Sequence, residues 1–402
     1  MDTLSLAPTF EPPRRQPTAP ETLSQSTPVL LRSHASGLLG RHTGGSAITV
    51  PAAGLGRSVA ERLEAQPELR LAGALPFDRD AASHLLPVQA ETDTASMDSW
   101  LSQQAGDADA GHPPTWRLTA EPSRASYEAS VARCVDLLLP SAGPLRKVVL
   151  ARTLLAQAVG PINPWWLARR LGTDPHALCF VVPLPVTVGE PPAWLVGATP
   201  ERLLSRHGAR IVSEPLAGSA PRLPDDASSH MRADALLRSR KDQQEHRYVV
   251  EAIADLLTPL CRQLRVPDSP SLYATHTMWH LGTRIEGELK DASPDALPYT
   301  SSAALAALLH PTPAVGGLPR AQAVQTISEL EPVPRGFYAG AVGWCNASGD
   351  GDWHIALRCA RVQGREVRLF AGAGIVAGSS PAAEGAETRA KFNTMLHALG
   401  VG

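Results

Sequence analysis

The sequence predicts an α+β fold with large antiparallel β-sheets in a sandwich flanked by helices. Between residues 116 and 402, strand-like runs follow one another through turn-like segments, while helical segments come in groups. The segment Ala347-Ser348-Gly349-Asp350-Gly351 has the composition of a hairpin loop between two such runs. Proline and glycine are spread throughout this region, so no linker divides it. This pattern argues against a doubly wound parallel sheet.

Composition limits the class of protein. The chain has 402 residues, of which 43% are hydrophobic, enough for a large core. Its formal net charge of −2 gives no electrostatic case for binding nucleic acid or an anionic membrane. No apolar run approaches the roughly 20 residues that cross a bilayer, and the N-terminus lacks a secretion signal. The five cysteines are scattered, which is typical of reduced thiols in a cytoplasmic protein rather than a zinc site or disulfide framework.

We divide the chain into three stretches. Residues 1–28 are rich in Pro, Thr and Ser, which predicts a disordered leader. Residues 29–115 are expected to form the N-terminal part of the sandwich. Within them we expect a helix at 59–68, a strand at 69–77 and a long surface loop at 91–114. Residues 116–402 carry the catalytic signals and are expected to form one structural domain with 29–115.

Helices and strands of the third stretch follow from periodicity and composition. Helices are predicted at 123–139, 164–171, 226–265, 301–309, 319–330 and 382–399. Strands are predicted at 146–152, 177–188, 193–198, 210–216, 336–346, 353–362 and 365–376, with two more within 271–288. The segment 217–220 is expected to end the strand before it.

Two predicted helices each carry a pair of carboxylates three residues apart. Glu384 and Glu387 share one face of the C-terminal helix with Lys391. Asp242 and Glu245 share one face of an earlier helix. Mg²⁺ takes oxygen ligands and commonly binds one or two protein carboxylates directly, so two direct and two water-bridged carboxylates would suit it. On spacing alone, two unrelated helix surfaces paired with arginines are an open alternative.

Two residues have the chemistry of proton transfer. Lys147 lies in a strongly apolar predicted strand, where desolvation favours the neutral amine and suits a general base. An edge-strand lysine that guards against aggregation is the alternative. Glu201 follows a predicted strand at a turn into the next element. It would act as a general acid there, or alternatively interact with a helix dipole.

Another group of residues suits a carboxylate ligand. Arg358 lies in a predicted strand, where alternation places it on one face with His354, and its forked guanidinium matches a carboxylate. Tyr338 would add a hydroxyl, and the backbone of Gly372 and Gly374 would approach the same anion closely. A structural salt bridge is the alternative role for Arg358.

Together these segments resemble the chorismate-utilising enzyme family from about residue 116 to 402. The resemblance rests on motifs in the family's order. They are Lys147-Val148-Val149-Leu150-Ala151-Arg152, Gly197-Ala198-Thr199-Pro200-Glu201, Pro215-Leu216-Ala217-Gly218-Ser219-Ala220-Pro221-Arg222, Lys241-Asp242 with Glu245-His246, His280-Leu281-Gly282-Thr283, His310-Pro311-Thr312-Pro313-Ala314, Gly340 to Trp344, and Ala371-Gly372-Ala373-Gly374-Ile375-Val376 with Glu384 and Lys391. Within the family, the His310 segment and the context Trp279-His280-Leu281 are most similar to isochorismate synthases of siderophore pathways.

The resemblance implies a Mg²⁺-dependent enzyme that binds chorismate in a deep site between sheet layers. It assigns Glu245 and Glu384 as direct metal ligands, with Asp242 and Glu387 near them, and the metal would hold the ring carboxylate. The enolpyruvyl carboxylate would be held by Tyr338, Arg358, Lys391, Gly372 and Gly374. The substrate would also be lined by Ala217, Gly218, Ser219 and His280. A monomer without an obligate glutaminase subunit is expected.

Two positions indicate the nucleophile through the same resemblance. Members that use ammonia generally carry glutamine where this chain has Lys147, and members that use a covalent lysine carry it where this chain has Ala217. Water needs a base, whereas an amine does not, so this combination points to water. The implied reaction is attack of water on C2 of chorismate, with Lys147 as base and Glu201 protonating the departing C4 hydroxyl. For this direction Lys147 must be neutral and Glu201 protonated. The product, isochorismate, would feed dihydroxybenzoate or salicylate siderophore synthesis.

Two other functions stay open. A salicylate synthase shares Lys147, Glu201 and the metal carboxylates, and continues to pyruvate elimination. A non-catalytic chorismate-binding protein would need neither proton-transfer residue. Many relatives also carry a bulky aromatic residue after the position of Glu384, where this chain has Gly385. That glycine either loosens the first turn of the helix or leaves space that a neighbour fills.

Overall fold

The computed structural model describes residues 27–34, 37–91, 93–106, 115–141, 143–223 and 225–401. The predicted leader therefore lies outside the described residues, except for its last two positions. The predicted division into leader, N-terminal part and catalytic region stays a prediction. No helix in these described ranges has the length and apolar character needed to cross a membrane.

The elements follow the chain in this order. The N-terminal part forms β1 (Pro28–Arg32), β2 (Gly37–His42), α1 (Ala52–Ala65), β3 (Arg70–Leu75), β4 (His84–Glu91) and α2 (Thr94–Ala105). The middle forms β5 (Arg117–Glu121), α3 (Arg124–Leu137), β6 (Lys147–Gln157), α4 (Pro164–Leu171), β7 (Leu178–Leu184), β8 (Ala193–Thr199), β9 (Arg202–His207), β10 (Arg210–Glu214), β11 (Leu216–Pro221), α5 (Asp226–Arg238), α6 (Arg240–Leu257), β12 (Cys261–Arg265), β13 (Ser271–Ala274), β14 (Met278–Gly282) and β15 (Ile285–Leu289). The C-terminal part forms α7 (Leu297–Thr300), α8 (Ser302–Leu309), β16 (Gly317–Leu318), α9 (Arg320–Leu330), β17 (Ala341–Asn346), β18 (Gly351–Ile355), β19 (Cys359–Gln363), β20 (Glu366–Ile375) and α10 (Pro381–Ala398).

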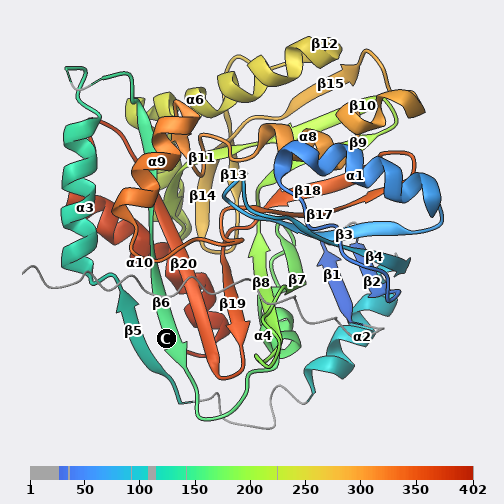
Figure 1. The fold of residues 1–402 in the computed structure, drawn as a ribbon. Helices are drawn as coiled ribbons and strands as arrows, with labels where there is room; N and C mark the ends of the chain where they lie inside the picture. Colours follow the sequence, from blue (N-terminus) through green and yellow to red (C-terminus); the bar gives the residue numbers. More distant parts are fainter. Residues whose placement is uncertain are drawn as a thin grey trace, which may run out of the picture.

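Seventeen of the strands pair in one sheet, and every pairing in it is antiparallel among the residues described. The strands lie side by side in the order β12, β15, β10, β9, β18, β17, β3, β4, β2, β1, β7, β8, β19, β20 and β6. Strand β6 then pairs with both β5 and β16. In Figure 1 the part from β6 to β1 runs down the view, whereas β17 and β18 run across it. A separate three-stranded sheet joins β11, β14 and β13. The predicted α+β fold with large antiparallel sheets is confirmed.

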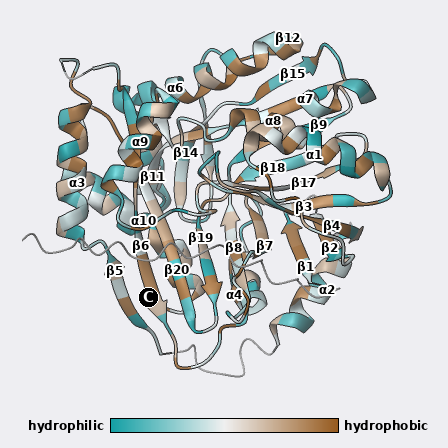
Figure 2. Ribbon diagram, viewed as in Figure 1, coloured by the Kyte–Doolittle hydropathy of each residue, from teal (hydrophilic) through white to brown (hydrophobic). Residues whose placement is uncertain are grey.

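Strand β7 in the middle of this sheet is buried on both faces. In β7, Phe180 and Val182 belong to one hydrophobic cluster, and the intervening Val181 belongs to another. The second cluster packs against helices α2, α4 and α10 through residues such as Leu101 and Leu167. Figure 2 shows hydrophobic residues along β1 and β6, in keeping with this double burial. Helices α2, α4 and α10 therefore cover one face of this part of the sheet, and its other face packs into the larger hydrophobic cluster.

Two predicted elements, a loop and a helix, are wrong for physical reasons. The predicted loop at 91–114 contains α2, whose N-terminal Asp93 accepts a hydrogen bond from the Ser96 amide at 2.9 Å. Met97 and Leu101 of α2 are buried four residues apart, which is helical spacing. The predicted helix at 226–265 ends before β12, which pairs with β15. Residues 107–114 of the predicted loop lie outside the described residues.

The segment predicted to end a strand at 217–220 is itself part of strand β11. It pairs with β14, and the register shifts between Ala217 and Ser219. Gly218 at this bulge has φ of 79°, a left-handed conformation that favours glycine. The predicted strand pair within 271–288 is three strands: β13 and β14 pair with each other, whereas β15 pairs with β10 and β12 in the large sheet.

A buried ion pair covers one edge of β6. Along this edge, β16 pairs with Val148 and β5 begins to pair at Thr153, so the positions between them lack a strand partner there. Arg335 donates to the Val149 carbonyl at 2.7 Å, and Glu331 accepts from the Ala151 amide at 2.7 Å. The two side chains also bond each other at 2.9 Å and are almost fully buried. The ion pair thus replaces a strand next to Lys147.

Replacing Glu331 by alanine should lower the free energy of unfolding by about 3–5 kcal/mol, because it leaves the buried Arg335 guanidinium without its partner. Asp234→Ala is the matched control, since Asp234 and Arg238 form an i,i+4 pair that is mostly exposed. Its loss should change stability by less than about 0.5 kcal/mol. Urea unfolding of the three proteins checks this, and equal midpoints for both variants would contradict the assignment.

Candidate active site

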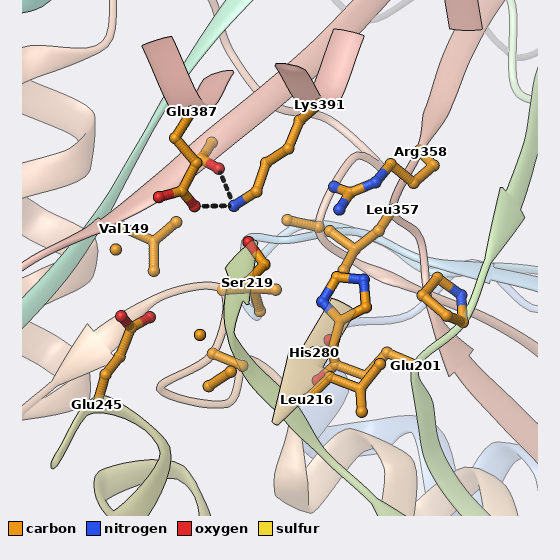
Figure 3. A pocket seen from close by; sticks show the side chains of 18 of the residues that line it. Val149, Glu201, Leu216, Ser219, Glu245, His280, Leu357, Arg358, Glu387 and Lys391 are labelled. Carbon is orange, nitrogen blue, oxygen red and sulfur yellow. Dashed lines mark hydrogen bonds and ion pairs between the residues drawn. The ribbon is translucent and has the colours of Figure 1, made fainter. Parts of the chain in front are cut away.

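A pocket with an empty volume of about 660 Å³, solvent at its mouth included, collects most of the predicted site residues. Those that line it are Glu201, Ala217, Gly218, Ser219, Glu245, His280, Tyr338, Arg358, Gly372, Gly374, Glu387 and Lys391. Figure 3 shows Glu245 on one side of the pocket and Glu201 on the other, with Ser219 between them. Lys147, Asp242 and Glu384 do not line the pocket themselves but contact or adjoin residues that do.

Lys147 lies behind the pocket wall at the start of β6. Its side chain is fully buried, and its Nζ lies 3.0 Å from Oε1 of Glu245, which lines the pocket. The geometry of this contact is not that of a hydrogen bond, so Nζ has no hydrogen-bond partner among the described residues. The amine is therefore buried beside a pocket-lining carboxylate without making a hydrogen bond of its own.

Glu201 lies on the opposite side, between β8 and β9. It is 3% exposed. Burial raises the pKa of Glu201 to about 8, although a hydrogen bond from the Leu216 backbone and the charges of Lys147 and Arg358 oppose the shift. The carboxyl group is therefore mainly protonated at neutral pH. This is the state that a general acid requires.

The carboxylates of α6 and α10 come together, an arrangement that their spacing alone left open. Ser239 caps the N-terminus of helix α6, and its hydroxyl accepts from the Asp242 amide at 3.2 Å. Burial, reinforced by Glu245 and Glu387, raises the pKa of Asp242. Burial and Glu387 also raise the pKa of Glu384, which is 1% exposed. The carboxylates from the two helices therefore sense one another's charge.

A lysine lies against each of three of these carboxylates. Lys147 lies on Glu245, Lys241 on Glu384 at 2.7 Å, and Lys391 on Glu387 at 2.5 Å. Burial alone would raise the pKa of Glu387, but the Lys391 ammonium outweighs it and lowers the pKa. Figure 3 shows the contact between Glu387 and Lys391 at the pocket.

The donor set suits Mg²⁺ in its chemistry. All four side chains are carboxylates, and a divalent cation would relieve the repulsion that helps to raise the pKa values of Asp242 and Glu384. In the part of the chain that the structure describes, however, no three His, Cys, Asp or Glu side chains are arranged to hold a metal ion. Instead, Glu245, Glu384 and Glu387 each contact the Nζ of a lysine.

Arg358 reaches the pocket from a turn, and its predicted place on a continuous strand is wrong. The predicted strand at 353–362 breaks into β18 and β19, and Arg358 between them has φ of 46°. Its carbonyl accepts from the Ala198 amide at 3.2 Å, which ties this turn to β8. Strand alternation therefore does not apply at Arg358, although the guanidinium still lines the pocket.

The glycine-rich end of β20 makes room for side chains. A Cβ at Gly374 would lie 2.3 Å from Oε1 of Glu245, and a Cβ at Gly372 would lie 3.2 Å from the Tyr338 hydroxyl. The Gly372 carbonyl accepts from Lys391 at 2.9 Å. Glycine at these positions is thus explained by close side-chain approach.

Ser219 and His280 face each other in the small sheet, where they are paired between β11 and β14. Burial lowers the pKa of His280 well below its usual range, so the ring is neutral. Its Nε2 is buried and lacks a hydrogen-bond partner among the described residues. Such a nitrogen is available to a polar ligand in the pocket.

Gly385 sits against a neighbouring side chain. A Cβ there would lie 2.8 Å from Oε1 of Glu128 on α3, and Arg124 binds the same carboxylate at 2.6 Å. The neighbour therefore fills the space, which settles the two alternatives that the sequence left open.

Other residues of the pocket were not predicted as site residues. The apolar wall is formed by Val149, Pro200, Leu216, Ala314, Val315, Ala339 and Leu357. Lys241 was predicted only as part of a motif, but its position four residues before Glu245 is the signal that could have placed it on the carboxylate face.

Comparison with known proteins identifies the family. The model of the family described as chorismate binding enzyme matches residues 78–400. The chain is 43% identical to the isochorismate synthase DhbC of Bacillus subtilis (strain 168) over 335 residues, which are 82% of this chain and 80% of that protein. It is 38% identical over 342 residues to the isochorismate synthase EntC of Escherichia coli (strain K12), covering 82% and 81%.

A solved structure shows the same fold. It is described as the putative 2,3-dihydroxybenzoate-specific isochorismate synthase DhbC of Bacillus anthracis. It superposes with a TM-score of 0.84 and 36% identity, covering 94% of this chain and 98% of the other. The predicted resemblance is confirmed, and this chain belongs to the chorismate binding enzyme family.

Proposed function

We propose that this chain is an isochorismate synthase, which converts chorismate into isochorismate. The relatives at 38–43% identity bear that name, and they match most of the chain. The observation that carries the proposal is the buried Glu201, a carboxyl group whose pKa is raised to about 8, facing a pocket with the buried Lys147 amine, in contact with Glu245, behind its opposite wall. A protein that only bound chorismate would need neither group.

The proposed chemistry is an exchange of hydroxyl groups between two ring carbons. Lys147 takes a proton from water as the water oxygen bonds to C2 of chorismate, and the ring double bonds shift. The C4 oxygen leaves as water after taking the Glu201 proton. One water enters and one departs, so the reaction is an isomerisation. Because water is the nucleophile, no ammonia-supplying partner is required.

The remaining residues would hold the two carboxylates of the substrate. Arg358 and Lys391, with Tyr338, would bind the enolpyruvyl carboxylate through charge-assisted hydrogen bonds. Ser219 and His280 would contact the ring. Mg²⁺ would be held by Glu245 and Glu384, with Asp242 and Glu387 near them, and would neutralise and orient the ring carboxylate.

A role in dihydroxybenzoate-dependent siderophore synthesis is part of the same proposal. The superposed Bacillus anthracis structure supports it, because that protein is described as 2,3-dihydroxybenzoate-specific.

Product analysis tests the proposal. The purified chain is incubated with chorismate and Mg²⁺, and the products are separated by chromatography. Isochorismate without pyruvate is the expected result. Salicylate with pyruvate would move the chain to the salicylate synthases, and chorismate bound but unchanged would refute an enzymatic role.

Replacing Gly374 by alanine should slow turnover by about 100-fold, because the new methyl group displaces the Glu245 carboxylate, and a misplacement of about 1 Å has effects of this size. The fold should tolerate the change, since the clash is with the end of a flexible side chain. Gly378→Ala is the matched control, because nothing lies within 4 Å of a Cβ at that position. Initial rates and unfolding midpoints of both variants check this. A fully active Gly374→Ala protein would contradict the role proposed for Glu245.

A further inference from the structure

Lys241 makes an ion pair that differs from the other two at the site. Its Nζ donates to Oε1 of Glu384 at 2.7 Å and so links α6 to α10 across 143 residues of sequence. The Glu384 side chain is 2% exposed, whereas that of Lys241 is 38% exposed. The ammonium group therefore reaches a buried carboxylate from the solvent side.

The surroundings of the other two lysines hold them in place. Lys147 is fully buried, and Lys391 is bonded to the Gly372 carbonyl as well as to Glu387. For Lys241, Glu384 is the one hydrogen-bond acceptor among the described residues. A long, flexible and partly exposed side chain with one acceptor can leave its carboxylate at little cost, since water can solvate the released ammonium.

The Lys241 charge acts on several carboxylates of the site. Glu384, Glu245 and Glu387 all interact with it, and they outweigh the effect of burial and raise its pKa. The Lys241 ammonium beside the carboxylates of α6 and α10 supplies positive charge where a divalent ion would supply it. Two cations cannot share one buried carboxylate without strong repulsion.

We infer that Lys241 is an internal competitor of the divalent cation. It holds Glu384 in the metal-free protein and must release that carboxylate before the metal binds. This rests on the proposed function, because that proposal makes Glu384 a metal ligand. The consequence is that the lysine lowers the affinity for the metal and keeps the buried carboxylate paired when no metal is present.

Calorimetric titration with MgCl₂ alone tests this on the full chain. Lys241→Gln removes the charge and should tighten Mg²⁺ binding by about tenfold or more. Lys241→Arg keeps the charge and should bind Mg²⁺ no more tightly than the unchanged chain. Arg240→Gln is the matched control, because Arg240 is the preceding residue of α6 and is exposed to solvent. Its charge is screened, so its loss should change the affinity by less than about twofold.

An unchanged or weaker Mg²⁺ affinity in Lys241→Gln would overturn the inference, as would equal tightening in Arg240→Gln. Absence of Mg²⁺ binding to all four proteins would overturn it together with the metal requirement. Urea unfolding without metal gives a second readout, in which Lys241→Gln should be destabilised and MgCl₂ should restore its stability. Chorismate turnover, measured separately, tests the proposed function, which can fail while the difference in metal affinity stands.

Discussion

Lys147→Gln should form isochorismate about 10²–10⁴-fold more slowly than the unchanged chain, which is the range that a positioned general base contributes. Glutamine fills much of the same buried volume, but it cannot take a proton from water. Chromatographic initial rates at saturating chorismate and Mg²⁺ measure the effect.

Lys290→Gln is the control for the loss of a lysine, because its ammonium lies at the surface and donates to the Pro259 carbonyl. It should retain full activity. A Lys147→Gln protein within tenfold of the unchanged rate would rule out Lys147 as the base. If Lys147→Gln and Lys290→Gln have equal unfolding midpoints, a lower rate in Lys147→Gln reflects the missing base and not a loss of fold.

Glu201→Gln should lower kcat by a similar 10²–10⁴-fold factor with little change in KM, because the amide keeps the shape of the carboxyl group but supplies no proton to the C4 hydroxyl. The control is Glu214→Gln, a nearby carboxylate that pairs with Arg202 at 2.7 Å outside the pocket. Its kcat should stay near that of the unchanged chain.

The pH dependence of kcat is a second test of Glu201. The active form of Glu201 is protonated, and burial raises its pKa to about 8. The rate of the unchanged chain should therefore fall above about pH 8, by about tenfold per pH unit. The residual rate of Glu201→Gln should lack this fall. A rate that stays constant through pH 10, or a variant that keeps the same profile, would contradict the role of Glu201.

Much of the fold was predictable because local composition carries it. The antiparallel character follows from strands joined by short turns, and helix α4 was predicted with its observed bounds because Pro164 and Gly172 mark its ends. Helix α2 was missed because polar residues dominate it, and its buried Met97 and Leu101 are few. The break at Arg358 was missed because a left-handed arginine has no signature in sequence.

The site was predictable only in part, for a physical reason. Pairs three residues apart on one helix, such as Glu384 and Glu387, follow from helical geometry. The contacts of Lys241 with Glu384 and of Arg335 with Val149 join residues more than a hundred positions apart. Residue spacing says nothing about such contacts, because the sheet and not the local chain brings them together.

The most direct test of the central claim follows the oxygen atom. The chain is incubated briefly with chorismate and Mg²⁺ in water enriched in ¹⁸O, and the isochorismate is examined by mass spectrometry. Attack of water on C2 predicts isochorismate that carries one ¹⁸O, in the hydroxyl group at C2. Unlabelled isochorismate would show that the C4 hydroxyl itself migrates, and it would contradict the roles proposed for Lys147 and Glu201.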